Sequence, residues 1–471
     1  MPFVPSIPLV PFATAAPHAP EAWITWLFAG LLALMITALA LEEQLHAKKS
    51  AITGLFAIIA LLGGTALGLL PFGDLTLPNG HHVTMPVYIP AVDWGVISII
   101  LGASLFVDVV SRSGIFTWTA IRLTRLSGGD PFWLLTYYAI LTVAFSAVLN
   151  NVTAMIIVGS LTAVSLGKLG RRDLMLGFLL TEGLLTNIGG LLTLISSVPN
   201  IILGQLAGIA FLKFLYVAAP YTLAATAVTV AMAVWWFKIE PMSTEVERRA
   251  AAELVAGFDE RDGIESQSFF NASWVMLGLF IAVLAGTQTL PVIQDLGMGF
   301  VAMAFAAIAL LKYKHEVERS YQAFDWDLLF FFVYLFVVIN VAEHAGVLDK
   351  IGESLGGLIA LGERPGGAAL LWSSALASSV TDNVPLAAVL GKILAAHPDV
   401  SGGSSLWWSC IFGCNLGGNF TPIGSASTVV AVSVMHKHGL KISFKDFVLQ
   451  AAPFALVHVA LATVYVAIYP L

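Results

Sequence analysis

The sequence predicts an all-α polytopic membrane protein, built from two inverted repeats of five transmembrane helices, each with a re-entrant hairpin and a broken helix. Two observations lead to this expectation. Apolar segments match the thickness of a bilayer, and short polar motifs recur in the same order in both halves. Of the 471 residues, 58% are hydrophobic and only 11% are charged, whereas soluble domains carry roughly 25% charged residues.

The apolar segments are about 20 residues long, which is the length of helix that crosses about 30 Å of hydrocarbon. We expect ten full spans, at 22–41, 50–72, 91–113, 173–205, 213–238, 268–289, 292–312, 326–345, 403–437 and 446–470. Segments 131–167 and 366–397 are also apolar, and we expect them to be re-entrant hairpins. Residues 1–21 are expected to form a Pro-rich tail, and 239–267 a cytoplasmic linker.

The distribution of Lys and Arg supports the hairpins and sets the orientation. Basic residues favour cytoplasmic loops. With the N-terminus outside and both hairpins returning to the side they entered, 18 of the 22 Lys and Arg residues lie inside. A hairpin that crossed fully would move the following basic loops outside. We therefore predict a multi-pass protein with both termini outside. The first 21 residues lack the basic start of a signal peptide, and from the lack of targeting signals we expect a bacterial inner (plasma) membrane.

The two halves share motifs at nearly constant spacing. Residues 150–152 (Asn-Asn-Val) recur as 382–384 (Asp-Asn-Val), 232 positions later. The stretch 187–197 (NIGGLLTLISS) recurs as 415–425 (NLGGNFTPIGS), 228 positions later. Such agreement at one spacing indicates an internal repeat.

The first repeat is predicted at 22–238 and the second at 268–471, each with five full spans. Because five is odd, the second repeat enters the membrane inverted relative to the first, as in secondary transporters whose binding site lies between the repeats near the midplane. Backbone that is not helical at this depth must be satisfied by protein or by a water-filled cavity. The two hairpin tips and the two Gly-Gly breaks, within 173–205 and 403–437, require such backbone.

Polar and glycine residues at these four places form the candidate substrate-binding site. Carbonyls at one half-helix end suit a cation, and N–H groups at the other suit an anion or a neutral oxygen-bearing molecule. The candidate residues are Asn150, Asn151, Thr153, Asn187, Gly189, Gly190, Thr193, Ser196, Ser197, Asn200, Thr381, Asp382, Asn383, Asn415, Gly417, Gly418, Thr421 and Ser425. Alternatively, Ser, Thr and Asn only join helices by hydrogen bonds; recurrence in both halves favours a site.

Carboxylates inside apolar spans are candidates for proton coupling because a charge in the membrane is costly. Asp382, at the second tip, is the strongest, with a helix cap as the alternative. Glu182, on the first broken helix, and Asp108, near the end of the third span, are coupling candidates or structural residues. Cys410 and Cys414 share one helix face and either touch a thiophilic substrate or are simply small buried residues.

Motifs for other chemistries are absent from the sequence. It contains no phosphate-binding GxxxxGK[ST] loop, no HExxH motif, no paired CxxC and no nucleophile elbow. No basic patch suggests nucleic acid. We therefore expect no enzyme activity, no catalytic residue, no metal site and no cofactor, and the lipid bilayer as a partner.

Four motifs together resemble the ArsB/NhaD permease family of the ion transporter superfamily: NNVT, TNIGGLLTLISSVPNII, ASSVTDNVP and GCNLGGNFTPIGSAST. The resemblance runs from about residue 90 to the end, and the melanosomal P protein has the same plan. It implies a homodimer with a scaffold domain and a moving transport domain of the elevator type, and the secondary exchange of a small inorganic substrate for protons. It leaves open whether a soluble ATPase subunit assists.

Substrates in this family include arsenite and antimonite, sodium, and organic anions. In the sodium–proton branch and the P protein the first tip usually reads Asp-Asn, whereas here it reads Asn150-Asn151, which leaves Asp382 as the main tip carboxylate. Arsenite at neutral pH is uncharged As(OH)₃ and needs hydrogen-bond donors and acceptors. We therefore expect proton-coupled efflux of arsenite and antimonite, with Na⁺(Li⁺)/H⁺ antiport, organic-anion permeation and a passive channel as alternatives.

Overall fold

A computed structural model describes residues 20–70, 74–76, 82–315 and 317–468. Residues 1–19 of the predicted tail lie outside this range. The described residues are helical apart from one short antiparallel pair, β1 (Asp74–Thr76) and β2 (His82–Thr84). The expected all-α polytopic class is confirmed.

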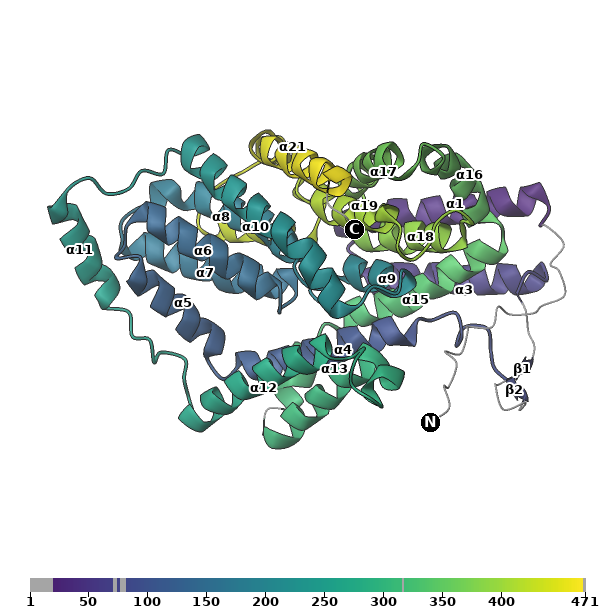
Figure 1. Cartoon of the computed structure of the whole chain (residues 1–471), viewed down its shortest axis with the longest axis horizontal. Helices are drawn as coiled ribbons and strands as arrows, with labels where there is room; N and C mark the ends of the chain where they lie inside the picture. Colours follow the sequence, from purple (N-terminus) through teal and green to yellow (C-terminus); the bar gives the residue numbers. More distant parts are fainter. Residues whose placement is uncertain (1–19, 71–73, 77–81, 316, 469–471) are drawn as a thin grey trace. The chain divides into compact units, whose positions relative to one another are not determined.

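The helices follow one another in this order (Figure 1): α1 (Ala22–Ala40), α2 (Glu42–Leu45), α3 (Lys49–Ala66), α4 (Trp94–Ser111), α5 (Ile115–Leu126), α6 (Pro131–Ser146), α7 (Asn151–Lys168), the 3₁₀ turn η1 (Arg172–Leu174), α8 (Met175–Gly189), α9 (Val198–Leu206), α10 (Phe211–Trp236), α11 (Glu245–Ala256), α12 (Gln267–Ala285), α13 (Ile293–Lys312), α14 (Val317–Ala323), α15 (Trp326–His344), α16 (Val347–Ile359), α17 (Glu363–Ser378), α18 (Asn383–Ala396), α19 (Ser405–Gly417), α20 (Ala426–Lys437) and α21 (Phe444–Ile468).

Within the described ranges, nine helices are long and apolar enough to cross a bilayer: α1, α3, α4, α7, α10, α12, α13, α15 and α21. Eight of them coincide with predicted spans, and α7 is the second arm of the first predicted hairpin. The other two predicted spans, 173–205 and 403–437, are each divided into two shorter helices, α8 with α9 and α19 with α20.

The chain forms two compact units. Unit 1 runs to Asp93 and includes Phe330–Ile351, and unit 2 comprises Trp94–Leu329 and Gly352–Leu471. In unit 1, α1 packs against α3. Glycine at position 54 lets the ring of Tyr334 lie where a Cβ would meet it at 3.1 Å. Every residue of the candidate site belongs to unit 2.

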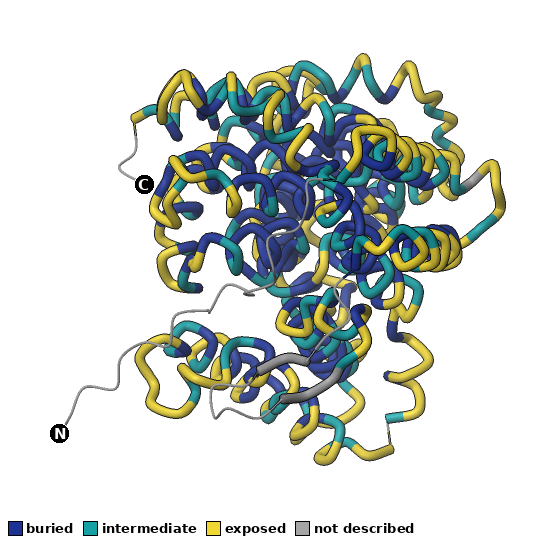
Figure 2. Tube along the Cα trace, turned by 90° about the vertical axis from the view of Figure 1, so that its right-hand side faces the viewer, coloured by how far each residue is buried: buried dark blue, intermediate teal, exposed yellow. Residues whose placement is uncertain are grey.

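Two almost completely buried helices form the centre of unit 2. All residues of α8 except Leu176 are buried, and all residues of α19 except Ser405. A helix that is apolar all round belongs in the interior. Figure 2 shows such buried stretches in dark blue, with the exposed sides of outer helices in yellow. Helices α6, α7 and α10 pack against α8, and α17 and α18 against α19.

The predicted linker, 239–267, contains a helix of its own. Helix α11 begins at a capping box, in which the Thr244 hydroxyl accepts from the Glu247 N–H and the Glu247 carboxylate accepts from the Thr244 N–H. Val255 and Phe258 then pack against Ile121 of α5. The linker is therefore held against an amphipathic helix of the first half.

Helices α4 and α13 approach closely because small residues line their contact. A Cβ at Gly102 would lie 2.4 Å from the carbonyl carbon of Ala302, and one at Gly299 would lie 2.9 Å from Ser98 Cβ. Close backbone approach through small residues is a common way for membrane helices to associate.

We expect Gly102→Ala to destabilise unit 2, because its methyl group would meet backbone rather than a movable side chain. Overpacking of this kind costs about 1–3 kcal/mol. Gly278→Ala, on α12, is the matched control, since nothing lies within 4 Å of its new Cβ. Thermal unfolding of the purified protein in detergent should show a lower midpoint for Gly102→Ala alone. Equal midpoints would contradict the packing described.

Candidate functional site

Each hairpin tip is a helix N-terminus capped by its own side chain. Asn150 Oδ1 accepts from the Thr153 N–H at 2.8 Å at the start of α7. Asp382 Oδ1 accepts from the Val384 N–H at 3.0 Å at the start of α18. Asn and Asp are favoured at this position because their oxygens satisfy free backbone N–H groups. The two tips therefore present equivalent turns, one neutral and one carrying a carboxylate.

Serine side chains join the end of each first hairpin arm to the helix beside it. Ser146 Oγ, at the end of α6, donates to Thr186 O of α8 at 2.6 Å. Ser378 Oγ, at the end of α17, donates to Cys414 O of α19, also at 2.6 Å. The serines are 232 positions apart and their acceptors 228, which are the spacings of the sequence motifs.

Threonines make a second bond of the same kind between each break and its tip. Thr193 Oγ1 donates to Ala147 O at 2.6 Å, and Thr421 Oγ1 donates to Ser379 O at 2.6 Å. Both acceptors are carbonyls just beyond the end of a hairpin arm, where no further helical turn can satisfy them.

The first glycine of each break permits this close contact. A Cβ at Gly189 would lie 2.8 Å from Val143 O, and a Cβ at Gly417 would lie 2.3 Å from Ala375 O. The two glycines are 228 positions apart, and the residues they contact, Val143 and Ala375, are 232 positions apart. The helix ends and hairpin arms are thus in contact in the same way in both halves.

The two breaks meet each other through Asn187. Its Nδ2 donates to Asn419 Oδ1 at 2.8 Å and to Ser425 Oγ at 2.9 Å. Its Oδ1 accepts from Ser427 Oγ at 3.2 Å and from Asn151 Nδ2 at 3.4 Å. An amide side chain has two donor hydrogens and two acceptor sites, so the hydrogen-bonding capacity of Asn187 is full.

Asn415 and Asn200 form the second junction between the breaks. Asn415 Nδ2 donates to Asn200 Oδ1 at 2.9 Å and to Ile411 O at 2.8 Å, and its Oδ1 accepts from Ser197 Oγ at 2.7 Å. Asn200 Nδ2 in turn donates to Gly190 O at 2.7 Å. These buried amides satisfy the backbone and side chains of the breaks and have little capacity left for a solute.

Four other predicted residues also shape the turns. A Cβ at Gly190 would lie 2.8 Å from the Asn151 amide, and Gly418 faces the far end of its own break. The hydroxyls of Ser196 and Thr381 bond back to nearby carbonyls, at 2.6 and 2.8 Å.

Thr153 and Asn383, at the tips, differ from these buried amides because they retain unoccupied polar groups. Asn150 is exposed, and Thr153, Asp382 and Asn383 are half-buried. In the described part of the chain, the Thr153 hydroxyl and the Asn383 amide have no hydrogen-bond partner. Unoccupied donors and acceptors of the candidate set therefore lie at the tips.

The other two predicted carboxylates have different environments. Glu182 is fully buried on α8; its Oε1 accepts from Thr162 Oγ1 at 2.5 Å, and its Oε2 has no partner among the described residues. Asp108 forms an ion pair with Arg112, one turn later, at 3.1 Å. A paired, partly exposed carboxylate is a weaker candidate for proton exchange, and we leave Asp108 out of the site.

Sequence reasoning missed several residues of the network. Asn419 stands where the first repeat has Leu191, and this single polar replacement in the shared motif was a usable signal. Ser146 and Ser378 lie 232 positions apart, a second usable signal. His458, buried on α21, contacts Asn419 at 3.4 Å, and its position in the middle of the predicted span 446–470 was a third usable signal.

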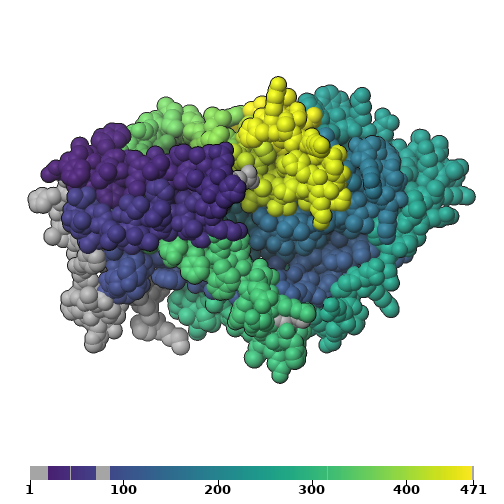
Figure 3. Space-filling model, turned by 180° about the vertical axis from the view of Figure 1, so that it is seen from behind, coloured from purple at the N-terminus to yellow at the C-terminus, as the bar shows by residue number. Residues whose placement is uncertain are grey.

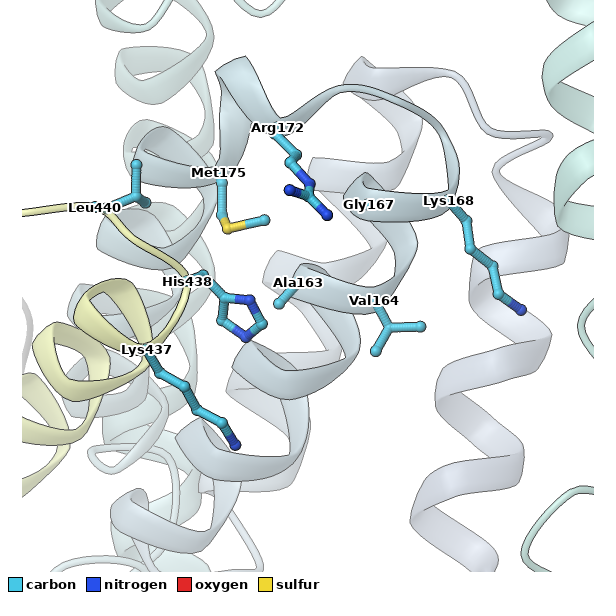
Figure 4. Close-up of a pocket in the computed structure, with 9 residues that line it drawn as sticks. All are labelled: Ala163, Val164, Gly167, Lys168, Arg172, Met175, Lys437, His438 and Leu440. Atoms are coloured by element: carbon cyan, nitrogen blue, oxygen red, sulfur yellow. The ribbon is translucent and has the colours of Figure 1, made fainter.

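A basic cavity of about 550 Å³ opens at one end of unit 2. It is lined by Ala163, Val164, Gly167, Lys168, Arg172, Met175, Lys437, His438 and Leu440. In Figure 4 the Arg172 guanidinium and the His438 ring converge, whereas Lys168 points away from them. Four basic side chains and no carboxylate line this space, which therefore suits an anion.

The bundle of apolar helices with interrupted helices at its centre defines a polytopic membrane transporter. The sequence profile of the citrate transporter family matches residues 47–413. The chain belongs to this family.

Relatives agree with this assignment. The chain is 28% identical to a 46 kDa membrane protein of Mycobacterium leprae, over 79% of this chain and 86% of that protein. It is 26% identical to an uncharacterized transporter of Mycobacterium tuberculosis, over 87% and 92%. The mouse P protein is 24% identical over 93% of this chain and 62% of its own length.

The fold is also found in a solved structure. The YdaH transporter of Alcanivorax borkumensis superimposes with a TM-score of 0.57 at 13% identity, covering 94% of this chain and 98% of that one. At this identity the likeness concerns the fold alone.

We expect Asn415→Ala and Asn150→Ala to differ in their effect on stability. Asn415→Ala leaves Asn200 Oδ1 and the Ser197 hydroxyl unpaired in the interior. Each unpaired buried group lowers the free energy of unfolding by about 1–3 kcal/mol. Asn150 is exposed, and loss of its cap costs about 1 kcal/mol. Thermal unfolding in detergent measures both variants. An Asn415→Ala midpoint equal to that of the wild type would show that the amide junction does not hold the breaks.

Proposed function

We propose that this transporter exports arsenite and antimonite across the inner membrane in exchange for protons, with the solute bound at the hairpin tips. The observation that carries the proposal is the chemistry of the tips. They offer the Asn150 and Asn383 amides, the Thr153 hydroxyl and one carboxylate, Asp382, with no Lys or Arg among them.

A neutral, polyhydroxyl solute fits such a set. As(OH)₃ and Sb(OH)₃ donate and accept hydrogen bonds, and amides and hydroxyls do both. A multiply charged anion, by contrast, would have to leave water without a cation to pair with it, which is costly. The free N-terminal turns of α7 and α18 add donors that suit solute oxygens.

Proton coupling is assigned to Asp382 and Glu182. Asp382 lies at the tip, where solute and proton can compete for the same carboxylate. Glu182 is buried with one unpartnered oxygen, and an ionised carboxylate in that state is costly. We infer that Glu182 carries a proton in this conformation and releases it when the surrounding helices move.

The membrane arrangement follows the repeat. The bond from Ser146 to Thr186 O recurs as the bond from Ser378 to Cys414 O, and the bond from Thr193 to Ala147 O recurs as the bond from Thr421 to Ser379 O. This recurrence supports two inverted repeats with re-entrant hairpins, and the distribution of Lys and Arg supports both termini outside. A homodimer in which unit 2 moves as the transport domain is the assembly we propose; an associated ATPase is not required by any feature of the site.

Citrate is the second candidate substrate. The family profile carries the name of citrate, and the cavity with Lys168, Arg172, Lys437 and His438 offers the positive charge that the tips lack. In this alternative the basic cavity gathers the anion before it reaches the tips.

Everted vesicles with an acidic interior distinguish these substrates. We expect As(III) and Sb(III) to be taken up and to dissipate the pH gradient, and Asp382→Asn to abolish both effects. Asp399→Asn, in an exposed loop, is the matched control. Collapse of the gradient by Na⁺ or Li⁺, or uptake of citrate, without metalloid uptake would overturn the metalloid assignment; metalloid uptake that ignores the gradient would indicate a passive channel.

The role of Glu182 is tested separately by Glu182→Gln. The amide keeps the shape and the bond to Thr162 but cannot exchange a proton. We therefore expect coupled uptake to fall by about 10²–10⁴, the usual effect of losing a proton-transferring group. Thermal stability should be kept. Glu253→Gln, exposed on α11, serves as the control. Unchanged uptake by Glu182→Gln would remove Glu182 from the coupling pathway.

A further inference from the structure

Helix α21 carries a buried histidine on the face opposite its exposed apolar side. Leu456, Val457 and Val464 are exposed, and Figure 3 shows α21 in yellow at the surface. His458 is fully buried. A buried imidazole in an apolar bundle is held by hydrogen bonds, so its partners determine what it can do.

The partners of His458 fix which ring nitrogen carries the hydrogen. Thr229 Oγ1, on α10, lies 2.6 Å from Ala225 O and 2.8 Å from His458 Nε2. The single hydroxyl hydrogen is used by the carbonyl, so the hydroxyl oxygen accepts from an Nε2–H. His458 Nδ1 then has a lone pair, which accepts from Asn419 Nδ2 at 3.4 Å. This arrangement requires the neutral ring.

From His458 a line of side chains leads to the first hairpin tip. Asn419 Oδ1 accepts from Asn187 Nδ2 at 2.8 Å, and Asn187 Oδ1 accepts from Asn151 Nδ2 at 3.4 Å. Asn151 Oδ1 lies 2.5 Å from Ser146 Oγ. In every amide of the line the nitrogen faces His458 and the oxygen faces the tip, because each side-chain amide donates from its nitrogen and accepts at its oxygen.

At the tip end of this line, Ser146 can hydrogen-bond to either orientation of the Asn151 amide. At the other end, the protonation state of the His458 ring fixes the orientation of the Asn419 amide. Ser146 has one hydroxyl hydrogen and two acceptors within reach, Asn151 Oδ1 and Thr186 O. It can therefore donate to Thr186 and accept from a reversed Asn151. The side partners of Asn187, Ser425 and Ser427, are hydroxyls that also serve either orientation.

We propose that His458 is a positioning residue that couples its protonation to the hairpin tip at Asn151 by reversing the amides of Asn419 and Asn187. When Nδ1 gains a proton, it must donate, so the Asn419 amide turns its oxygen to the ring and gives up the bond that its Nδ2 donates to Leu184 O at 3.3 Å. The NH₂ group of Asn419 then faces Asn187. The Asn187 amide therefore reverses so that its oxygen accepts from Asn419, and the Asn151 amide reverses in the same way. Protonation thereby changes the bonds that hold the tip that receives the solute.

Few other ionisable groups share the surroundings of His458. On α10, the Tyr221 hydroxyl donates to His458 O at 3.0 Å. Helix α8 carries Glu182, which is bonded to Thr162 of α7, and α19 carries Cys410 and Cys414. Helix α17 carries Glu363 and Arg364 in its first turn, and α21 itself carries Lys445, Asp446 and Tyr465.

The role of this coupling in transport rests on the proposed function. The coupling itself can be tested by a measurement without solute. The probe is the hydrogen-exchange protection of backbone amides in 147–153, corrected for intrinsic exchange. It is followed from about pH 3 to about pH 8, a range that extends more than three units below the ordinary histidine value near 6.5. We expect protection in the wild type to fall at low pH by about fivefold or more, the lower range of coupling between two sites.

Two variants of the histidine and its partner should respond differently. His458→Asn keeps an acceptor near the Nδ1 position but binds no proton, so the tip should stay protected at every pH. Thr229→Val removes the acceptor that fixes the ring, so the tip should be weakly protected at every pH. His436→Asn, an exposed histidine, should behave as the wild type.

A wild type without pH-dependent protection, or a His458→Asn protein that keeps the dependence, would overturn the inference. If His458→Asn does not fold, Thr229→Val decides alone, and wild-type behaviour of that variant is the contrary result. Loss of metalloid uptake together with intact pH-dependent protection would instead overturn the proposed substrate and leave the role of His458 standing.

Discussion

The structure depends on one constraint: two helices are interrupted inside an apolar bundle, and the polar backbone they expose must find partners there. Carbonyls and N–H groups at a helix end cost free energy when buried without hydrogen bonds. The bonds of Ser146, Thr193 and their counterparts Ser378 and Thr421 meet this need between hairpin and break. The amides of Asn187 and Asn415 meet it between the two breaks. Glycine at the first position of each break allows the backbones to come close enough.

This constraint divides the polar residues into two groups. Buried amides such as Asn187 and Asn415 are occupied by the protein, so they determine the geometry of the breaks. Thr153 and Asn383, at the tips, keep unoccupied donors and acceptors, and we propose that the tips determine which solute is recognised. Under this proposal the site recognises hydrogen-bonding shape more than charge. The basic cavity near Lys168 and Arg172 has the opposite character, and its role depends on the charge of the substrate.

Much of this could be predicted from the sequence because the requirements are local. Gly-Gly pairs, capping residues at the tips, and spans of bilayer length are visible without a structure, and so is the recurrence at 228 and 232 positions. The sequence did not show which polar residues are occupied within the protein and which keep free groups. That distinction depends on which side chains are in contact in the folded chain. Asn187 meets Asn419 across 232 residues, and His458 joins them from the last helix. Asp108 is similar: its partner, Arg112, lies one turn away, but only geometry shows that they are bonded.

The location of a bound metalloid tests the central claim most directly. Antimony scatters X-rays anomalously, so diffraction from crystals soaked with Sb(III) places the ion without assumptions about the transport cycle. We expect an anomalous peak beside the hairpin tips, within hydrogen-bonding reach of Asn150, Thr153 or Asn383, and we expect Asn150→Ala to abolish it. A peak confined to the cavity of Arg172 and His438, with none at the tips, would contradict it.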